Sequence, residues 1–244
     1  MSGKTQSWYI IMPYSQIWCG HNMKPGRYVL DLLKENSASG RIILYIRHSK
    51  RDSFMGVPEH LRHGVEITPE GVKMALEFGN SLQEIFPGRR LVLGHTTARR
   101  CQMTAEFISR GFSTECSQII DFQEKIEDPI LNMDSYVNLR DEKGWQNLII
   151  QWLNQQVPED IMQDPDIYAD THVKRLLAFD NIDDESLFVV IGHDYTLFPI
   201  ISSVLGKKVT GIDFLNGIVI NANSERNEIM FSDEDCKVRR VLEY

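Results

Sequence analysis

Features that would assign a protein to a membrane or to secretion are missing from this chain of 244 residues. No apolar run reaches the length of about 18 residues that a membrane-spanning helix needs. The N-terminal segment has no sustained apolar stretch and no clear cleavage site, so no signal peptide is expected. Internal repeats and low-complexity tracts are absent as well. We therefore expect a cytoplasmic protein that has no membrane partner.

Cysteines and positive charges are also scarce. The cysteines, Cys19, Cys101, Cys116 and Cys236, have no C-x-x-C spacing, which predicts reduced thiols rather than a disulfide framework or a zinc site. Lys and Arg number 26 against 34 Asp and Glu, so the formal net charge is −8. That balance argues against a nucleic-acid partner. The hydrophobic share of 42% is typical of a folded core.

Three short apolar runs predict the centre of a β-sheet. They are Ile42–Ile46, Leu91–Leu93 and Leu187–Ile191, and none of them alternates with polar residues. Strands of this kind are buried on both faces, as in a parallel sheet. Helical patterns separate them along the chain. We therefore predict an α/β protein, a three-layer sandwich with a mostly parallel central sheet.

The remaining elements follow from apolar periodicity and from turn residues. Thr68 and Pro69 mark a helix start, because threonine caps helix N-termini and proline suits the first helical position. The predicted helices are Arg27–Lys34, Thr68–Ile85, a helix containing Thr104–Ser109, Trp145–Gln155, Thr171–Ala178 and Thr196–Leu205, and the predicted C-terminal strands are Gly217–Asn221, Glu228–Ser232 and Lys237–Leu242. We interpret residues 1–244 as one domain, with an N-terminal extension (1–40) and a small cap formed by the irregular insertion 112–185.

A histidine follows each of the three apolar strands. These residues are His48, His95 and His193. Because ligands of open parallel sheets bind outside the carboxyl ends of the strands, we expect the three histidines to share one crevice. Such a cluster could hold a metal ion with an open coordination position, or it could bind an anion.

The neighbouring side chains favour the anion. Arg47 and Arg51 flank His48, and Arg99 and Arg100 follow His95. A guanidinium within about 5 Å of a dication is repulsive by several kcal/mol, whereas its planar fork matches phosphate oxygens. We therefore predict a phosphate pocket in which a neutral histidine is the nucleophile, with no metal and no cofactor.

Four segments, in this order, resemble motifs of the histidine phosphatase superfamily. Arg47-His48-Ser49-Lys50-Arg51 is similar to its R-H-G signature, Glu66–Gly71 to its L-T-x-x-G helix start, Arg100–Ala105 to its R-A-x-x-T-A segment, and Gly192-His193-Asp194 to its second histidine motif. The R-H-x-x-R and H-D forms resemble the acid phosphatase branch. The resemblance covers about residues 41–109 and 186–221 and implies a phosphoglycerate mutase-like fold.

The resemblance also implies an activity, the hydrolysis of phosphomonoesters through a phosphohistidine intermediate. It makes His48 the nucleophile, places Arg47, Arg51, Arg100 and His193 on the phosphate, and makes Asp194 the acid that protonates the leaving oxygen. Glu124 and Glu127 are alternative acids, because other branches supply this group from the segment after the second arginine motif.

Two departures from the family pattern bear on the site. Ser49 stands where the family has glycine, and its Cβ is expected to narrow the approach or to change the turn. A literal R-H-G occurs at Arg62-His63-Gly64, but no apolar strand precedes it. We therefore expect Arg62, like His95, at the rim of the pocket.

Three functions remain open on this basis. The leading one is a phosphatase acting on a phosphorylated small molecule. A phosphoprotein phosphatase with an open cap is the second, and a phosphate-binding scaffold that kept the fold is the third. The sequence does not distinguish the substrates, and it gives no oligomeric state.

Overall fold

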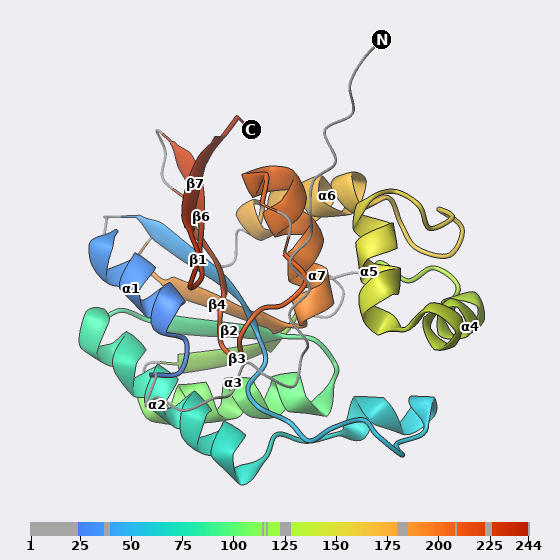
Figure 1. Cartoon of the computed structure of the whole chain (residues 1–244). Helices are drawn as coiled ribbons and strands as arrows, with labels where there is room; N and C mark the ends of the chain where they lie inside the picture. Colours follow the sequence, from blue (N-terminus) through green and yellow to red (C-terminus); the bar gives the residue numbers. More distant parts are fainter. Residues whose placement is uncertain are drawn as a thin grey trace.

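The computed structural model describes residues 24–36, 40–113, 115, 117–122, 128–179, 185–207, 209–222 and 226–243. A seven-stranded sheet lies at its centre (Figure 1), in the order β3-β2-β4-β1-β5-β6-β7. The strands are β1 (Arg41–Arg47), β2 (Leu91–His95), β3 (Ser117–Asp121), β4 (Leu187–Gly192), β5 (Gly217–Ala222), β6 (Asn227–Ser232) and β7 (Lys237–Leu242). The first four in the spatial order are parallel, and the last three continue antiparallel from β1. The predicted α/β class, with a sheet that is parallel in its core, is confirmed.

Helices cover both faces of the sheet, which produces three layers. On one face lie α1 (Arg27–Glu35), α2 (Pro69–Ile85) and α3 (Arg99–Phe112), packed against the side chains of Ile42, Leu44 and Ile46. On the other face lie α5 (Trp145–Leu153), α6 (Pro165–Leu177), α7 (Asp194–Pro199) and the short π-helix η4 (Ile200–Val204), packed against Ile43 and Tyr45. Both faces of β1 are thus buried, which explains its unbroken apolar run.

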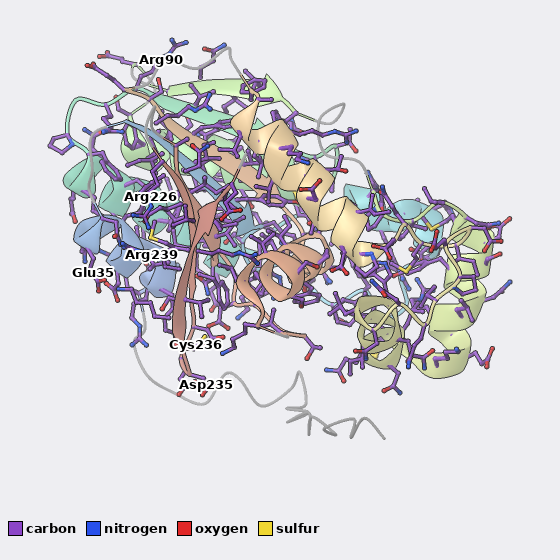
Figure 2. All side chains as sticks on the ribbon, turned by 90° about the horizontal axis from the view of Figure 1, so that it is seen from above. Glu35, Arg90, Arg226, Asp235, Cys236 and Arg239 are labelled. Carbon is purple, nitrogen blue, oxygen red and sulfur yellow. The ribbon has the colours of Figure 1, made fainter. Side chains whose placement is uncertain are left out.

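Two further elements lie away from the sheet. The 3-10 helix η1 (Glu59–Gly64) follows the loop after β1, and α4 (Met133–Lys143) precedes α5. In Figures 1 and 2 both lie at the opposite end of the molecule from α1, whose Glu35 is labelled in Figure 2. On that α1 side, Lys237 of β7 pairs with Glu35, and Arg239 lies 3.6 Å from Glu228.

The predicted extension and cap have different boundaries in the structure. Leu30 and Leu33 of α1 are at most 1% exposed and belong to the core, so only residues 1–23 remain outside the described fold on the N-terminal side. Within 112–185, β3 pairs with β2 in the sheet and α6 packs on the sheet face. The predicted limits are therefore wrong. β3 is a short edge strand with only two consecutive apolar residues, so its sequence resembles a loop.

Some helices also differ from their predicted limits. α6 begins at Pro165 rather than Thr171, and Asp164 caps it by accepting hydrogen bonds from the N–H groups of Asp166 and Ile167. The helix α4 was not predicted, because its sequence is mostly polar and has no apolar stripe. The predicted helix Thr196–Leu205 corresponds to α7 together with η4.

Among the described residues, no helix combines the length and the apolar character that crossing a bilayer requires. Cys101 and Cys236 are free thiols, while Cys19 and Cys116 lie outside the described residues.

Candidate active site

Two histidines meet at the carboxyl edge of the sheet. Arg47 lies opposite Gly192 in the β1–β4 ladder, so the next residues, His48 and His193, leave the sheet at the same level. Their ring centroids are 5.5 Å apart, and the edge of one ring faces the other. His48 is 3% exposed and His193 is 7% exposed. The structure thus brings together side chains that are 145 residues apart in the sequence.

His95 does not join this pair. In the β2–β4 ladder it lies opposite Ile191, two residues before the level of His193. Its Nδ1 is 2.9 Å from the carbonyl oxygen of Thr96, and its side chain is not part of the cavity wall. Thr96 and Thr97 line the cavity instead. The prediction that places His95 in the crevice or at its rim is wrong, because a sequence shows where strands end but not their register.

One hydrogen bond sets the tautomer of His48. Its Nδ1 is 2.7 Å from the carbonyl oxygen of Ser49. A carbonyl oxygen can only accept, so Nδ1 carries the proton and Nε2 keeps its lone pair. Burial lowers the pKa of His48 well below its ordinary value, and the nearby His193, Arg47 and Arg100 lower it further. His48 is therefore neutral at neutral pH and has an unprotonated Nε2.

The serine after His48 is bound to α2 and α3 rather than to the pocket. Its N–H donates to Oγ1 of Thr104 (3.0 Å), and its hydroxyl donates to the carbonyl oxygen of Gly71 (2.7 Å). Ser49 does not adopt a left-handed backbone conformation and is not part of the cavity wall. The predicted narrowing of the approach by its Cβ is therefore wrong. Instead, Ser49 fixes the loop that carries His48.

His193 is held by groups from three elements. Nη2 of Arg100 lies 3.4 Å from its Nδ1, and Oγ1 of Thr96 lies 3.4 Å from its Nε2. Its ring stacks on Tyr195, with 5.5 Å between centroids and 4° between planes. Burial and the charge of Arg100 lower the pKa of His193 well below its ordinary value. Because Arg100 donates to Nδ1, the proton of the neutral ring is on Nε2, on the side of Thr96, and the residue itself lines the cavity.

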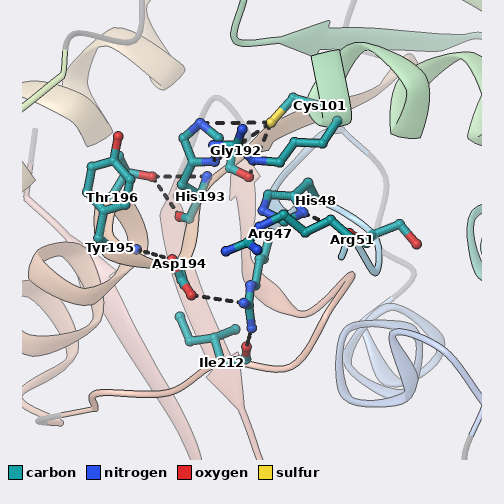
Figure 3. Close-up of polar contacts among 12 residues, drawn as sticks. Arg47, His48, Arg51, Cys101, Gly192, His193, Asp194, Tyr195, Thr196 and Ile212 are labelled. Carbon is teal, nitrogen blue, oxygen red and sulfur yellow. Dashed lines mark hydrogen bonds and ion pairs between the residues drawn. The ribbon is translucent and has the colours of Figure 1, made fainter. Parts of the chain in front are cut away.

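Cys101 lies beside His193 but has the wrong properties for a nucleophile. Its Sγ is 3.9 Å from Nδ1 of His193 and 3.6 Å from the carbonyl oxygen of Gly192 (Figure 3). The thiol is fully buried, and burial raises its pKa to about 11. A thiolate is the reactive form of cysteine, so Cys101 is a packing residue.

Three guanidinium groups surround Phe54, a residue that the sequence analysis missed. Its ring centroid is 3.4 Å from Cζ of Arg51, 5.3 Å from that of Arg100 and 5.4 Å from that of Arg62. Arg100 also donates from Nη1 to the carbonyl oxygen of Arg62 (3.0 Å). The only sequence signal for Phe54 is an aromatic side chain three residues after Arg51. The structure places Arg51, Arg62 and Arg100 in one cavity wall.

Arg47 joins Asp194 to the chain before β5. Its Nη2 is 3.0 Å from Oδ2 of Asp194, and its Nη1 donates to the carbonyl oxygen of Ile212 (Figure 3). The guanidinium also lies 4.3 Å above the ring of Phe214. Both partners of the ion pair line the cavity. An ion pair with a guanidinium favours the ionised carboxylate, which has no proton to donate.

A second carboxyl group in the cavity wall has different surroundings. Asp128 accepts a hydrogen bond from the hydroxyl of Tyr195 (3.1 Å) and another from the N–H of Ile130 (3.0 Å). Desolvation by the surrounding protein raises the pKa of Asp128 and outweighs both hydrogen bonds. Asp128 follows the two acids expected from the sequence, Glu124 and Glu127, and no sequence signal distinguishes it from them. Both glutamates lie outside the described residues.

These groups line one cavity of about 2000 Å³. It extends from His48 past η1 and Phe54 to α4 and the start of α5. Within the described part of the chain, no three His, Cys, Asp or Glu side chains are grouped as ligands of a metal ion would be. The arrangement is suited chemically to an anion held beside a neutral histidine.

Solved structures share this fold. A phosphoglycerate mutase from Bacillus anthracis aligns with a TM-score of 0.51 and 14% identity over 76% of this chain and 89% of its own. A mycobacterial glucosyl-3-phosphoglycerate phosphatase, solved with VO3, aligns with a TM-score of 0.50 and 13% identity over 84% and 97%. No family model and no curated protein matches the sequence. The chain shares the fold of these two structures, so the predicted phosphoglycerate mutase-like architecture is confirmed.

Proposed function

We propose that this protein is a phosphatase that hydrolyses phosphomonoesters through a phosphohistidine on His48. The observation that carries the proposal is the hydrogen bond from Nδ1 of His48 to the carbonyl oxygen of Ser49. It leaves Nε2 unprotonated in a buried, neutral ring whose side chain lines the arginine-walled cavity. A neutral imidazole nitrogen beside an anion site is the arrangement that nucleophilic attack on a phosphoryl group requires.

The reaction has two steps. Nε2 of His48 attacks phosphorus, the bond from phosphorus to the ester oxygen breaks, and the leaving oxygen takes a proton from an acid. Water then attacks the phosphohistidine, the phosphorus–nitrogen bond breaks, and inorganic phosphate leaves. The conjugate base of the same acid accepts a proton from the attacking water. Neither step needs a group from outside the protein, so metal independence belongs to the proposal.

Arg100 and His193 are the groups best placed to bind the phosphate oxygens. Arg100 is 8% exposed, and its Nε has no hydrogen-bond partner among the described residues. His193, which follows the neighbouring strand β4, presents a neutral ring beside His48. Arg51 lines the same wall. Arg47 also lines this wall. Its guanidinium is paired with Asp194, so a phosphate that contacts Arg47 would share the guanidinium with that carboxylate.

Asp128 is the described carboxyl group best suited to donate the proton. Its pKa is raised, so it keeps its proton to a higher pH than an ordinary aspartate does, and it is part of the cavity wall. Asp194, named from its place beside His193, is paired with Arg47 and is better suited to fixing that guanidinium. Glu124 and Glu127 remain alternatives.

Trapping the phosphoenzyme tests the proposal. The protein, given a ³²P-labelled aryl phosphate with chelator present and quenched within milliseconds, should carry label that is stable in alkali and lost in acid, as phosphohistidine is. His48→Asn should remove both the label and turnover. His95→Asn is the matched control, because His95 also follows a central strand but lies outside the cavity wall, and it should keep both. Turnover without a labelled enzyme, or turnover that stops when chelator is added, would contradict the proposal.

A further inference from the structure

The cavity is too large for a phosphate and a small leaving group alone. Its volume of about 2000 Å³ exceeds the ~300–1,000 Å³ of ordinary small-molecule sites. Its near half contains His48 and Arg100, and its far half is bounded by η1 and α4. The guanidinium of Arg100 lines the near half beside His48, so that half carries a positive charge suited to an anion.

The far half carries the opposite charge. Asp134 and Asp141 lie seven residues apart on α4, hence on one face of that helix, and both are exposed in the cavity wall. Asp52 and Glu59 add two carboxylates from the η1 side, where Glu59 is paired with Arg62 (2.7 Å), so carboxylates remain in excess in this half. Arg140 is the arginine of α4 in this wall, and its guanidinium is already bound to Glu59 and Asp141. A second phosphate on the substrate would therefore face carboxylates, whereas a cationic group would be attracted.

Exposed apolar side chains stand on both sides of the same half. Met55 is 89% exposed and Met133 is 48% exposed, and both line the cavity. Leu61 of η1 and Leu131, just before α4, are 54% and 61% exposed and lie outside the cavity wall, near it in the sequence. Apolar side chains of this size on a binding surface, methionine among them, are typical of contacts with another protein. Neutral sugars and nucleotides offer neither aliphatic side chains nor a primary ammonium group to such walls.

Together these features indicate a ligand that is anionic at one end and cationic and aliphatic at the other. We propose that the substrate is a phosphorylated segment of a protein in which basic and aliphatic residues flank the phosphorylated one. The inference rests on the proposed phosphatase activity and names its substrate class. The phosphoryl group binds beside His48, and lysine or arginine side chains of the segment lie against Asp134 and Asp141.

Matched phosphotyrosine peptides test the substrate class. Two peptides of nine residues share a central phosphotyrosine and flanking leucines, and their remaining positions are lysine in one and glutamate in the other. At low salt, kcat/KM for the lysine peptide should be about tenfold or more above that for the glutamate peptide and above that for free phosphotyrosine, and the preference should shrink as added salt screens the charges. An aryl phosphate, measured beside them, reports the phosphatase activity itself.

Two double variants then test which carboxylates cause the preference for the lysine peptide. In Asp134→Asn/Asp141→Asn the ratio of kcat/KM for the two peptides should fall toward one. Glu142→Gln/Asp160→Asn makes the same change in net charge at exposed residues outside the cavity wall and should keep the wild-type ratio. If the aryl phosphate is hydrolysed but both peptides equal free phosphotyrosine, or a phosphorylated sugar or nucleotide exceeds them, the substrate class is wrong. If no phosphate ester is hydrolysed, the proposed phosphatase function itself fails.

Discussion

At the residue scale, the chemistry of the site depends on which hydrogen bonds each ionisable group makes. His48 and His193 both have a lowered pKa, yet the two neutral rings carry their protons on different nitrogens. The carbonyl oxygen of Ser49 accepts from Nδ1 of His48, which leaves the lone pair on Nε2. Arg100 donates to Nδ1 of His193, which leaves the proton on Nε2 of that ring. The two carboxyl groups differ in the same way, because Asp194 has a cation beside it and Asp128 has a neutral hydroxyl.

The identity of the proton donor follows from that difference. Asp128→Asn should slow hydrolysis of an alkyl phosphate by about 10²–10⁴-fold, and should slow an aryl phosphate with an acidic phenol far less, because a poor leaving group needs its proton in the transition state. Asp194→Asn should slow both substrates by similar factors, since it loosens Arg47 and removes no donated proton. Steady-state kinetics on the two esters gives the comparison.

The reverse pattern would restore Asp194 as the donor. If neither variant depends on the leaving group, the role passes to Glu124 or Glu127, and the same two esters applied to Glu124→Gln and Glu127→Gln decide between them.

At the element scale, the position of His48, the proposed nucleophile, depends on how closely α2 approaches the loop after β1. A Cβ on Gly71, in the first turn of α2, would lie 2.1 Å from the carbonyl oxygen of Lys50. The hydroxyl of Ser49 donates to the carbonyl oxygen of Gly71, and Thr68 caps the helix by accepting from the N–H of Gly71. The start of α2 and the loop that carries His48 and Ser49 therefore form one packed unit.

Gly71→Ala should separate that unit. The added methyl group must displace backbone, so we expect a loss of about 1–3 kcal/mol in the free energy of unfolding and a fall in kcat, because Ser49 and with it His48 shift. Gly64→Ala is the matched control, since a Cβ there meets nothing within 4 Å. Urea unfolding and aryl phosphate kinetics measure both effects. Equal behaviour of the two variants would show that the close approach is unimportant.

At the scale of the whole molecule, two neutral histidines buried in one cavity link stability to pH. Each has a pKa well below 6.5 in the folded state, whereas the unfolded chain has the ordinary value. Below pH 6.5 the unfolded chain therefore binds protons that the folded one does not. The two neutral histidines therefore stabilise the folded state fully above that pH, and this contribution to the free energy of unfolding is lost as the pH falls.

Unfolding measurements should show this loss. Between pH 7.5 and 5.5 the two groups together should remove about 2–3 kcal/mol from the free energy of unfolding. In His48→Asn/His193→Asn the decrease over the same interval should be smaller by that amount, because the remaining titrating groups are common to both proteins. Urea titrations at the two pH values give the figure. An unchanged pH dependence in the variant would mean that these histidines are not buried neutral.

The sequence by itself determined the three central strands, the helix start at Thr68 and the pairing of His48 with His193. Runs such as Leu187–Ile191 have no polar residue, so they can only be buried on both faces, and residues directly after such strands must lie at one edge of the sheet. These are local consequences of composition and chain direction, which need no knowledge of the neighbouring elements.

Only the tertiary structure decided which residues complete the site. In the β2–β4 ladder His95 lies opposite Ile191, and so two residues before the level of His193. The packing of η1 places Arg62 beside Phe54 and Arg100. Desolvation in the folded protein raises the pKa of Asp128, and the hydroxyl of the distant Tyr195 binds its carboxyl group. Register, desolvation and long-range ion pairs depend on distances between segments that the chain order leaves free, so the sequence could single out His48 as the proposed nucleophile but not its full surroundings.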